Sequence, residues 1–509
     1  MATFEYSSCE SYLWEYYSVG QKQWILFNFE MATECEYAFT RGIKTIHSTL
    51  DENDSISAYD IDFVNMKQIN KNSGYERLIR RRKISGNHLL LFNSFAKELL
   101  KLVNTIPAKI HTNIDEANKW TKYSAVKNVN HLYLFKHFCK YIKTLDRAVG
   151  SIVGMAVGDA VGAPLEFADV MNGDGVKHNF FYFSLLDGYN RELNSFKLKR
   201  GQWTDDAAMG FCMADSILSC GGQFDGSDCR ARFHTWWHYG YCNAFRKEKE
   251  LKSSIGLGGN ISKSLKDCKP GIMPSATFQL ENEDAGNGSI MRLAPIPVAF
   301  HSNIALAREK AALSSYTTHP GPLAAECCAL MAHIIVSAIY TNHKNIKDFL
   351  DEMVVEYLSI INDLLIIDNS KSDSLSKIER LLKCEELDTS TELCWNWKMD
   401  SLNIWHTITN RGSKYNGYPV LPGYFGSFCM DGLAIALWSV YHTNSFDEAI
   451  ERCVNVLGDA DSTGSIAGQI AGAFYGYSTI SPQFCKNLEK WDDGDAVVRG
   501  ALLYCINDN

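Results

Sequence analysis

Apolar and polar residues alternate with the period of a strand along the first part of the chain. Trp24 and Leu26 follow this period, and the residues after Phe29 take up the spacing of a helix. A polar, turn-rich stretch at 48–55 separates them from further strand-like residues. Side chains alternate between the two faces of a strand but recur about every 3.6 residues on a helix. Residues 1–83 are therefore predicted to form a small α+β domain.

The remainder of the chain has the period of helices. Residues 84–145 carry an apolar helical face without a chemical motif, so we interpret them as a helical connector, with a flexible spacer as the alternative. Helical periodicity dominates from 146 to 509, and proline is scarce there, which predicts one large all-α domain. The polar stretch at 368–390 is expected to be a surface insertion in that domain.

Composition excludes several classes of protein. The 509 residues are 46% hydrophobic, which gives a prior of about two to four domains and excludes a mainly disordered chain. A net charge of −9 argues against a polycation for duplex nucleic acid, so no direct DNA binding is expected. We see no targeting segment at the N-terminus. Sixteen cysteines without metal-site spacing are interpreted as reduced thiols, as in a cytoplasmic or nuclear protein.

Two runs place glycine at every fourth position, at 150–162 and at 464–476. Each glycine inside a helix costs about 1 kcal/mol relative to alanine, so close packing of two backbones is the expected compensation. Membrane helix dimers use the same spacing. However, the runs and the apolar stretch from Cys327 to Tyr340 are shorter than the roughly 20 residues that a membrane span needs. We therefore expect no membrane association.

Acidic residues stand at the starts of two predicted helices. Thr204-Asp205-Asp206 precedes an apolar helix, and Asp459, Asp461 and Ser462 precede the second glycine run. Ionised carboxylates are stabilised at helix N-termini, and with hydroxyl groups they are ligands for Mg²⁺, Mn²⁺ or Ca²⁺. Either segment alone is explained by helix capping. The two together, with Glu166, favour a metal site.

Two further segments have a structural and a functional interpretation. Gly286-Asn287-Gly288-Ser289 is either a turn or a loop whose backbone N–H groups approach a phosphate. His319 is either a histidine at the boundary of the core or a polar contact in a cleft.

Six short strings follow one another along the helical part of the chain: GDAVGAPLE at 158–166, WTDD at 203–206, SIG at 254–256, GNGSIMR at 286–292, THP at 318–320 and GDADS at 458–462. Taken in this order, they resemble the ADP-ribosylglycohydrolase family of the dinitrogenase-reductase-activating type, over most of residues 146–480. No string is decisive alone, but their common order is specific.

The resemblance implies an all-α catalytic domain with two divalent metal ions, Mg²⁺ or Mn²⁺. One ion would be held by Thr204, Asp205, Asp206 and Asp461, and the other by Asp459, Asp461 and Ser462. Glu166 would be a mobile carboxylate near the second ion and, with Asp206, a catalytic residue. The diphosphate of ADP-ribose would bind at Gly286, Asn287, Gly288 and Ser289, and His319 would lie along the ligand.

The sequence departs from the family pattern at two positions. Leu457 stands where the family usually has glycine, which is expected to alter the approach of the loop to the ribose. Ser462 stands where threonine is common, and its hydroxyl keeps metal binding feasible.

The N-terminal segment is similar to a WWE domain over roughly residues 10–83. Trp14, Trp24, the EYAF string at 36–39, the run at 59–68 and the arginines at 77–82 stand in the order of that family. The resemblance implies binding of ADP-ribose units of poly(ADP-ribose) by Tyr17, Trp24, Tyr59, Gln68 and Arg77. Aromatic rings stack on adenine, an amide reads its edge and a guanidinium pairs with phosphate.

Simpler interpretations of this segment stay open. Trp14 and Trp24 would otherwise be core aromatics, and the arginines from Arg77 onwards would lie on a solvated edge strand. Some WWE domains bind protein partners without using a ligand pocket.

Three functions are consistent with the sequence. The first is a metal-dependent hydrolase that removes ADP-ribose from protein or poly(ADP-ribose), with the WWE-like module tethering the substrate. The second is a non-catalytic reader of ADP-ribose, against which the complete set of oxygen ligands argues. The third is a hydrolase of arginine-linked ADP-ribose recruited through a WWE protein-interaction module.

Overall fold

The computed structural model describes residues 11–20, 22–27, 29–52, 55–84, 88–108, 124–129, 132–167, 195–248, 253–269, 271–279, 285–367, 372–384, 395–402, 404, 414–415, 418–419 and 423–507. The chain divides into two compact units. One comprises residues 1–94 and 131–137, and the other comprises residues 95–130 and 138–509. The boundaries at 83 and 145 stay predictions, because the stretch between them is shared by both units.

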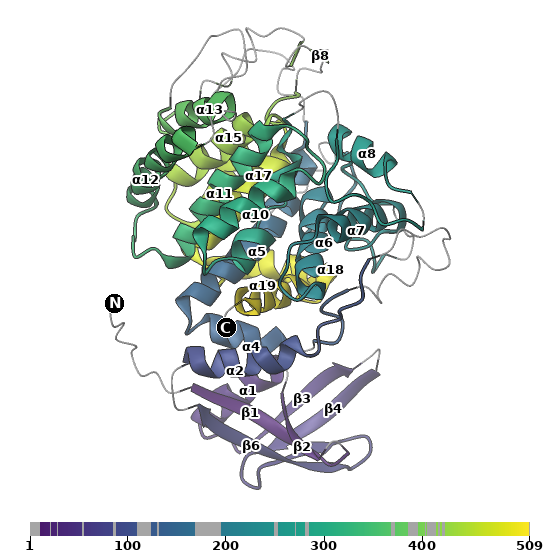
Figure 1. The fold of residues 1–509 in the computed structure, drawn as a ribbon. Coiled ribbons are helices and arrows are strands. Elements are labelled where there is room, and N and C mark those ends of the chain that lie inside the picture. Colours follow the sequence, from purple (N-terminus) through teal and green to yellow (C-terminus); the bar gives the residue numbers. More distant parts are fainter. Residues whose placement is uncertain are drawn as a thin grey trace. The chain divides into compact units, whose positions relative to one another are not determined.

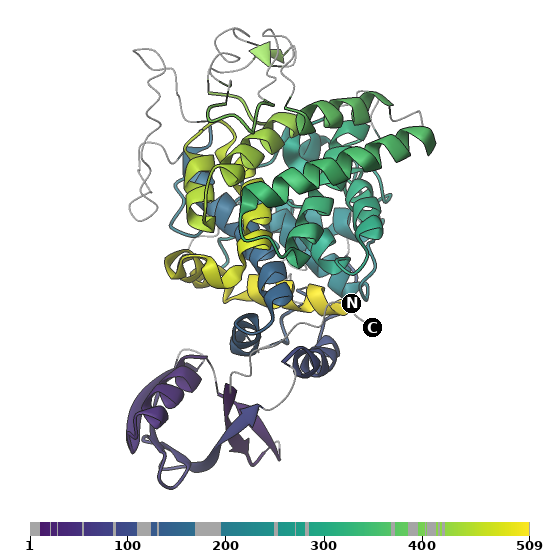
Figure 2. The same cartoon turned by 90° about the vertical axis from the view of Figure 1, so that its left-hand side faces the viewer.

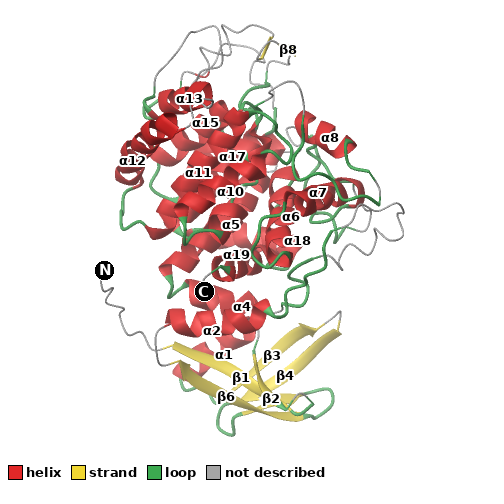
Figure 3. Cartoon of the chain, viewed as in Figure 1, coloured by secondary structure: helices red, strands yellow, loops and turns green. Residues whose placement is uncertain are grey.

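The first unit is an antiparallel sheet with one helix against it, as the alternating pattern predicts (Figure 1 and Figure 3). Its described strands lie in the order β2-β1-β6-β5-β4-β3. The elements are β1 (Ser11–Ser18), β2 (Gln23–Leu26), α1 (Phe29–Thr40), β3 (Thr45–Glu52), β4 (Ser55–Asp62), β5 (Lys67–Asn70) and β6 (Glu76–Ile84).

A small aromatic core joins the helix α1 to the sheet. Trp14 on β1 is 1% exposed, and its ring meets Phe39 and Phe63 edge to face. Such edge contacts add stability beyond the burial of area. The interpretation of Trp14 as a core residue is therefore confirmed.

Two helices follow the sheet. They are α2 (His88–Leu100) and α4 (Leu132–Cys139), and Phe92 of α2 contacts Phe135 of α4 edge to face. Residues 140–142 are not helical, and a separate helix begins at Lys143.

The second unit is built mainly of helices (Figure 2). They are α5 (Lys143–Gly162), α6 (Asp205–Ser219), α7 (Gly226–Tyr239), α8 (Gly259–Lys266), α9 (Pro295–Ala299), α10 (Ile304–Ser315), α11 (Pro322–Tyr340), α12 (Ile346–Ile367), α13 (Ser372–Leu382), α15 (Cys429–Tyr441), α16 (Phe446–Val454), α17 (Ala460–Tyr475), α18 (Pro482–Asp492) and α19 (Asp495–Ile506). Short 3₁₀ turns are η2 (Ala163–Leu165), η3 (Asn287–Ser289) and η5 (Tyr477–Thr479), and β7 (Lys414–Tyr415) pairs with β8 (Tyr418–Pro419).

The glycine runs lie on α5 and α17, which pack side by side in the centre of this unit (Figure 1). A Cβ atom on Gly158 would lie 2.0 Å from the carbonyl oxygen of Gly464, and one on Gly154 would lie 2.1 Å from that of Gly468. Only glycine permits such an approach of two backbones. The predicted close packing of the two runs is confirmed.

Two sequence arguments need correction. By length and composition α5 with η2 (143–165) and α11 could both cross a membrane, so shortness is not what distinguishes them from membrane spans. Their most apolar windows are 100% and 89% buried inside the unit, as is typical of core helices. The stretch expected to be a surface insertion also contains α13, which buries an apolar face including Leu375 and Ile378.

Candidate active site

The predicted acidic and glycine-rich segments meet at one cavity of about 1030 Å³ in the helical unit. Of the predicted residues, those that line it are Glu166, Asp205, Gly286, Asn287, Gly288, His319, Asp459, Asp461 and Ser462. Thr204 and Asp206 are buried directly behind Asp461, because the Thr204 hydroxyl lies 3.3 Å from an Asp461 oxygen and 3.4 Å from an Asp206 oxygen. Segments more than 250 residues apart therefore build one site.

Five carboxylates form two groups that share Asp461. One group is Asp159, Asp206 and Asp461, and the other is Glu166, Asp459 and Asp461. Within each group one oxygen of every carboxylate lies within 4.8 Å of the others. A shared carboxylate between two clusters of hard oxygen donors is an arrangement suited to a pair of divalent cations.

Asp159 orients the turn at Thr204, which leads into Asp205 and Asp206 of α6. Its carboxylate accepts hydrogen bonds from the N–H and the hydroxyl of Thr204 and from the N–H of Ala207, each at 2.9 Å. Asp159 is not among the residues predicted to form the site, although it stands in the 158–166 string. The signal that could have identified it is a charged residue directly after Gly158, within an otherwise apolar helix that is buried.

Burial and mutual repulsion oppose ionisation of these carboxyl groups. Burial, followed by the neighbouring carboxylates, raises the pKa of Glu166, Asp206 and Asp461 well above the ordinary range. Burial raises the pKa of Asp159 to about 6. A cation bound among these oxygens would relieve the repulsion.

The donor set fits divalent metal ions. Among the described residues, Asp206 Oδ1 is buried without a hydrogen-bond partner, so it has free lone pairs within the cluster. The neighbouring donors are carboxylate and hydroxyl oxygens, which Mg²⁺ and Mn²⁺ prefer. Ser462, the residue after Asp461, also lines the cavity, and its hydroxyl lies 3.5 Å from Met291 Sδ.

The 286–289 loop supports the carboxylates and forms part of the cavity wall. Asn287 donates from its side chain to Asp459 (2.9 Å) and to the carbonyl of Gly426 (3.2 Å). The Ser289 hydroxyl lies away from the lining, where it accepts a hydrogen bond from Ser315 (2.9 Å). The structure therefore brings Gly286, Asn287 and Gly288 to the cavity, but not the side chain of Ser289.

His319 forms the wall next to this loop. Burial, and to a lesser extent the positive charge of Arg292, lowers the pKa of His319 to about 3. The ring is therefore neutral. Arg292 donates to the Thr318 hydroxyl (2.6 Å), which leaves the hydroxyl proton for His319 Nδ1 at 2.8 Å. This network favours the tautomer with the proton on Nε2, the ring nitrogen that faces Gly286 and Gly288. His319 can therefore donate a hydrogen bond into the cavity.

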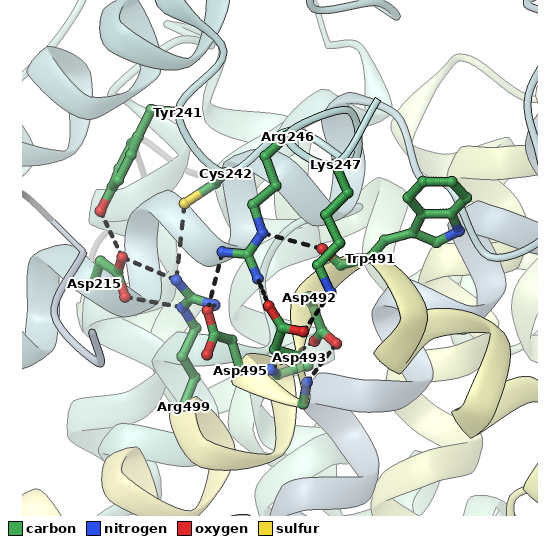
Figure 4. A network of polar contacts seen from close by, with 12 residues as sticks. Asp215, Tyr241, Cys242, Arg246, Lys247, Trp491, Asp492, Asp493, Asp495 and Arg499 are labelled. Carbon is green, nitrogen blue, oxygen red and sulfur yellow. Dashed lines mark hydrogen bonds and ion pairs between the residues drawn. The ribbon is translucent and has the colours of Figure 1, made fainter. Parts of the chain in front are cut away.

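A buried charge cluster holds α6, which carries Asp205 and Asp206, against α19 (Figure 4). Arg499 of α19 binds both oxygens of Asp215 of α6, at 2.9 and 3.1 Å. Tyr241 donates to the same carboxylate at 2.5 Å. Bidentate pairs of this kind fix geometry as well as charge.

In the sheet unit, three of the predicted ligand-binding residues come together. Arg77 donates from Nε to Gln68 at 2.6 Å, and its guanidinium lies 5.5 Å from the centre of the Tyr59 ring. Gln68 is fully buried, and its Nε2 has no hydrogen-bond partner among the described residues. A free amide donor beside a guanidinium suits a ligand with acceptor atoms.

The fourth member of this cluster is Tyr16 rather than Tyr17. Arg77 stacks on Tyr16 at 3.6 Å. Successive residues of β1 point to opposite faces of the sheet, so Tyr17 lies on the other face from Tyr16. Trp24 belongs to β2, but its side chain lies outside the described residues.

The sequence profile of the ADP-ribosylglycohydrolases matches residues 141–506, more than half of the chain. The chain belongs to the ADP-ribosylglycohydrolase family. It is accordingly a glycohydrolase, and its N-terminal unit matches the WWE domain profile over residues 12–81. The predicted fold class, a WWE domain followed by a mainly helical ADP-ribosylglycohydrolase domain, is confirmed.

Relatives of this ADP-ribosylglycohydrolase carry several names. It is 27% identical to the ADP-ribosylarginine hydrolase Tri1 of Pseudomonas putida, over 68% of this chain and 75% of that protein. It is 26% identical to the ADP-ribosylhydrolase ARH3 of Danio rerio, over 72% and 92%. A solved structure of an ADP-ribosylglycohydrolase-related protein complex covers 72% of this chain and 99% of its own, at 23% identity and a TM-score of 0.46.

One departure from the family pattern has a structural cost. Leu457 has a φ of +68°, in the left-handed region that favours glycine, and it is followed by Gly458 at +64°. The leucine side chain is buried, at 1% exposed. Core packing therefore holds this ADP-ribosylglycohydrolase in a backbone conformation that glycine would adopt without strain.

Proposed function

We propose that this enzyme is a metal-dependent hydrolase that releases ADP-ribose from ADP-ribosylated proteins or poly(ADP-ribose), and that its WWE domain binds ADP-ribose units of the substrate. The observation that carries the proposal is the sharing of Asp461 by two buried carboxylate groups at one cavity. Paired clusters of oxygen donors are typical of hydrolytic sites with two divalent ions.

We propose the following ligands. Thr204, Asp205, Asp206 and Asp461 would hold one ion, with Asp159 orienting the Thr204 turn. Asp459, Asp461 and Ser462 would hold the other, with Glu166 beside it as the mobile carboxylate. When bound, Mg²⁺ or Mn²⁺ would supply Lewis-acid polarisation and would neutralise the carboxylates.

The remaining groups bind and orient the sugar nucleotide. His319 would donate from Nε2 to an oxygen of ADP-ribose, and Gly286 and Gly288 leave room for the diphosphate beside it. Glu166 is the carboxyl group assigned to proton transfer at the bond between the anomeric carbon and its substituent, because it lies next to Asp459 and Asp461 at the cavity wall. Electrostatic stabilisation by the carboxylates would favour the cationic character that develops on the ribose.

The WWE domain would act by tethering. A module that holds one unit of a modified chain raises the effective concentration of the neighbouring units at the hydrolase cavity. The grouping of Tyr16, Tyr59, Gln68 and Arg77 supports this role. We also propose a cytoplasmic or nuclear location, supported by described cysteines that form no disulfide bond with one another.

The test is release of free ADP-ribose from poly(ADP-ribose), from a serine-linked peptide and from an arginine-linked peptide, with Mg²⁺ or with EDTA. Metal-dependent release from one of them, lost in an Asp459→Asn/Asp461→Asn variant, would support the proposal and identify the linkage. Equal release in Mg²⁺ and in EDTA would contradict the metal dependence. Release only from the arginine-linked peptide, with no polymer binding, would favour a WWE domain that recruits the hydrolase to a protein partner.

A further inference from the structure

Phe167 has an unusual backbone conformation next to the proposed proton-transfer residue. It follows Glu166 directly and has a φ of +49°, in the left-handed region that phenylalanine rarely adopts. Its N–H donates to the carbonyl of Gly458 at 2.7 Å. Residue 167 is thereby joined to the loop that carries Asp459. Strained residues of this kind persist only where the surroundings hold them.

An aromatic stack holds the Phe167 side chain. Its ring lies 4.7 Å from that of Tyr424, centre to centre, with an angle of 17° between the planes. Both residues line the cavity. The segment of Tyr424 is tied to the same loop, because the Phe425 carbonyl accepts a hydrogen bond from the N–H of Asp459 at 2.9 Å.

Three segments therefore converge beside the second carboxylate group. Gly458 lies at their centre, since a Cβ atom there would lie 2.5 Å from the Phe425 ring. The stack joins the 166–167 segment to the 424–426 segment, and hydrogen bonds join both to 458–459. Glu166 stands at the end of this arrangement, after the last turn of η2.

We propose that the Phe167–Tyr424 stack is a latch that positions Glu166 beside Asp459 and Asp461. This inference rests on the proposed function, because it gives Phe167 and Tyr424 the role of positioning Glu166 in the proposed active site. Phe167 and Tyr424 are positioning residues, and they act through Glu166. Loss of the stack lets the backbone at residue 167 relax from its left-handed conformation, which moves the Glu166 carboxylate away from the other two.

The test uses the full-length protein and the variants Phe167→Ala, Tyr424→Ala and their double variant. Calorimetric titration of the metal-free proteins with Mn²⁺ is expected to show one of two sites weakened about tenfold in each single variant, because an orienting contact is lost. With an active substrate, kcat is expected to fall about tenfold while KM stays within about twofold. The double variant is expected to lose no more than either single variant, because both remove the same stack.

Tyr424→Phe is the conservative control, because it keeps the stacked ring and removes only the hydroxyl. Its Mn²⁺ affinity and kcat are expected to equal those of the unaltered protein. Should Tyr424→Ala melt at a lower temperature, Tyr424→Leu keeps apolar volume without a planar ring and is expected to show the same losses. Normal Mn²⁺ binding and kcat in both single variants, or additive losses in the double variant, would overturn the latch.

The experiments distinguish failure of the hydrolase proposal from failure of the latch. If the unaltered protein binds Mn²⁺ but releases no ADP-ribose from any substrate, the hydrolase proposal fails and the Mn²⁺ titration still decides on the latch. Absence of Mn²⁺ binding by the unaltered protein would overturn both.

Discussion

At the residue scale, the cavity depends on a glycine that has no room for a side chain. A Cβ atom on Gly288 would lie 2.9 Å from His319 Cε1, so Gly288→Ala is expected to displace the imidazole that we assign to ligand binding. We predict an affinity for ADP-ribose reduced about tenfold, the equivalent of one well-placed hydrogen bond. Isothermal titration calorimetry checks this. Gly259→Ala is the control in the same cavity, because its Cβ would have no heavy atom within 4 Å.

The carboxylates predict how metal binding depends on pH. Metal ions bind the ionised form, and burial raises the pKa of Asp159 to about 6 and that of Asp461 well above its ordinary range. Protons therefore compete increasingly as the pH falls through 6, and binding releases protons. We expect the Mn²⁺ affinity to fall at least about tenfold between pH 7.5 and pH 5.5. The same affinity at both values would contradict the raised pKa values.

At the element scale, helix propensity and the contact between α5 and α17 predict opposite effects of Gly468→Ala on the free energy of unfolding. Helix propensity alone would stabilise the protein by about 1 kcal/mol. However, the new Cβ would lie 2.0 Å from the carbonyl oxygen of Gly154, so the helices must separate. We predict a net loss of about 1–3 kcal/mol in the free energy of unfolding, measured by chemical denaturation. A more stable variant would show that the contact is not tight.

The elements also show which features a sequence can reveal. The α5–α17 contact could be predicted because its signal, glycine at every fourth position, repeats within each helix. The stack of Phe167 on Tyr424 could not be predicted from the sequence, because the two residues are 257 positions apart and belong to no repeat. The role of Asp159 could not be predicted for a similar reason, because its hydrogen bonds reach a turn that begins 45 residues away.

The choice between Tyr16 and Tyr17 depends on strand register. A shift of one residue moves every side chain of a strand to the opposite face. Here the register is set by pairing with β6, which places Tyr16 opposite Ile79. That pairing joins the two ends of the domain, and the composition of β1, with aromatic residues at 12, 14, 16 and 17, does not indicate which of the last two faces Arg77.

At the scale of the whole molecule, the two domains of the enzyme are expected to act on one substrate. If the WWE domain holds a polymer unit, its contribution depends on substrate length, because a short ADP-ribosyl peptide offers only one unit to bind. Effective concentration then raises turnover of the polymer without changing the chemistry at the cavity. Catalysis and tethering can therefore be separated by comparing substrates.

Arg77→Ala removes the guanidinium that contacts Tyr16, Tyr59 and Gln68. At substrate concentrations below KM, we expect its rate on long poly(ADP-ribose) to fall about tenfold or more, with unchanged rates on a mono-ADP-ribosyl peptide. Arg41→Ala is the matched control, because Arg41 also stacks on a tyrosine, Tyr37, but belongs to another part of the WWE domain. An equal loss on both substrates would place the effect in the hydrolase cavity, and no loss on the polymer would favour a protein partner for the WWE domain.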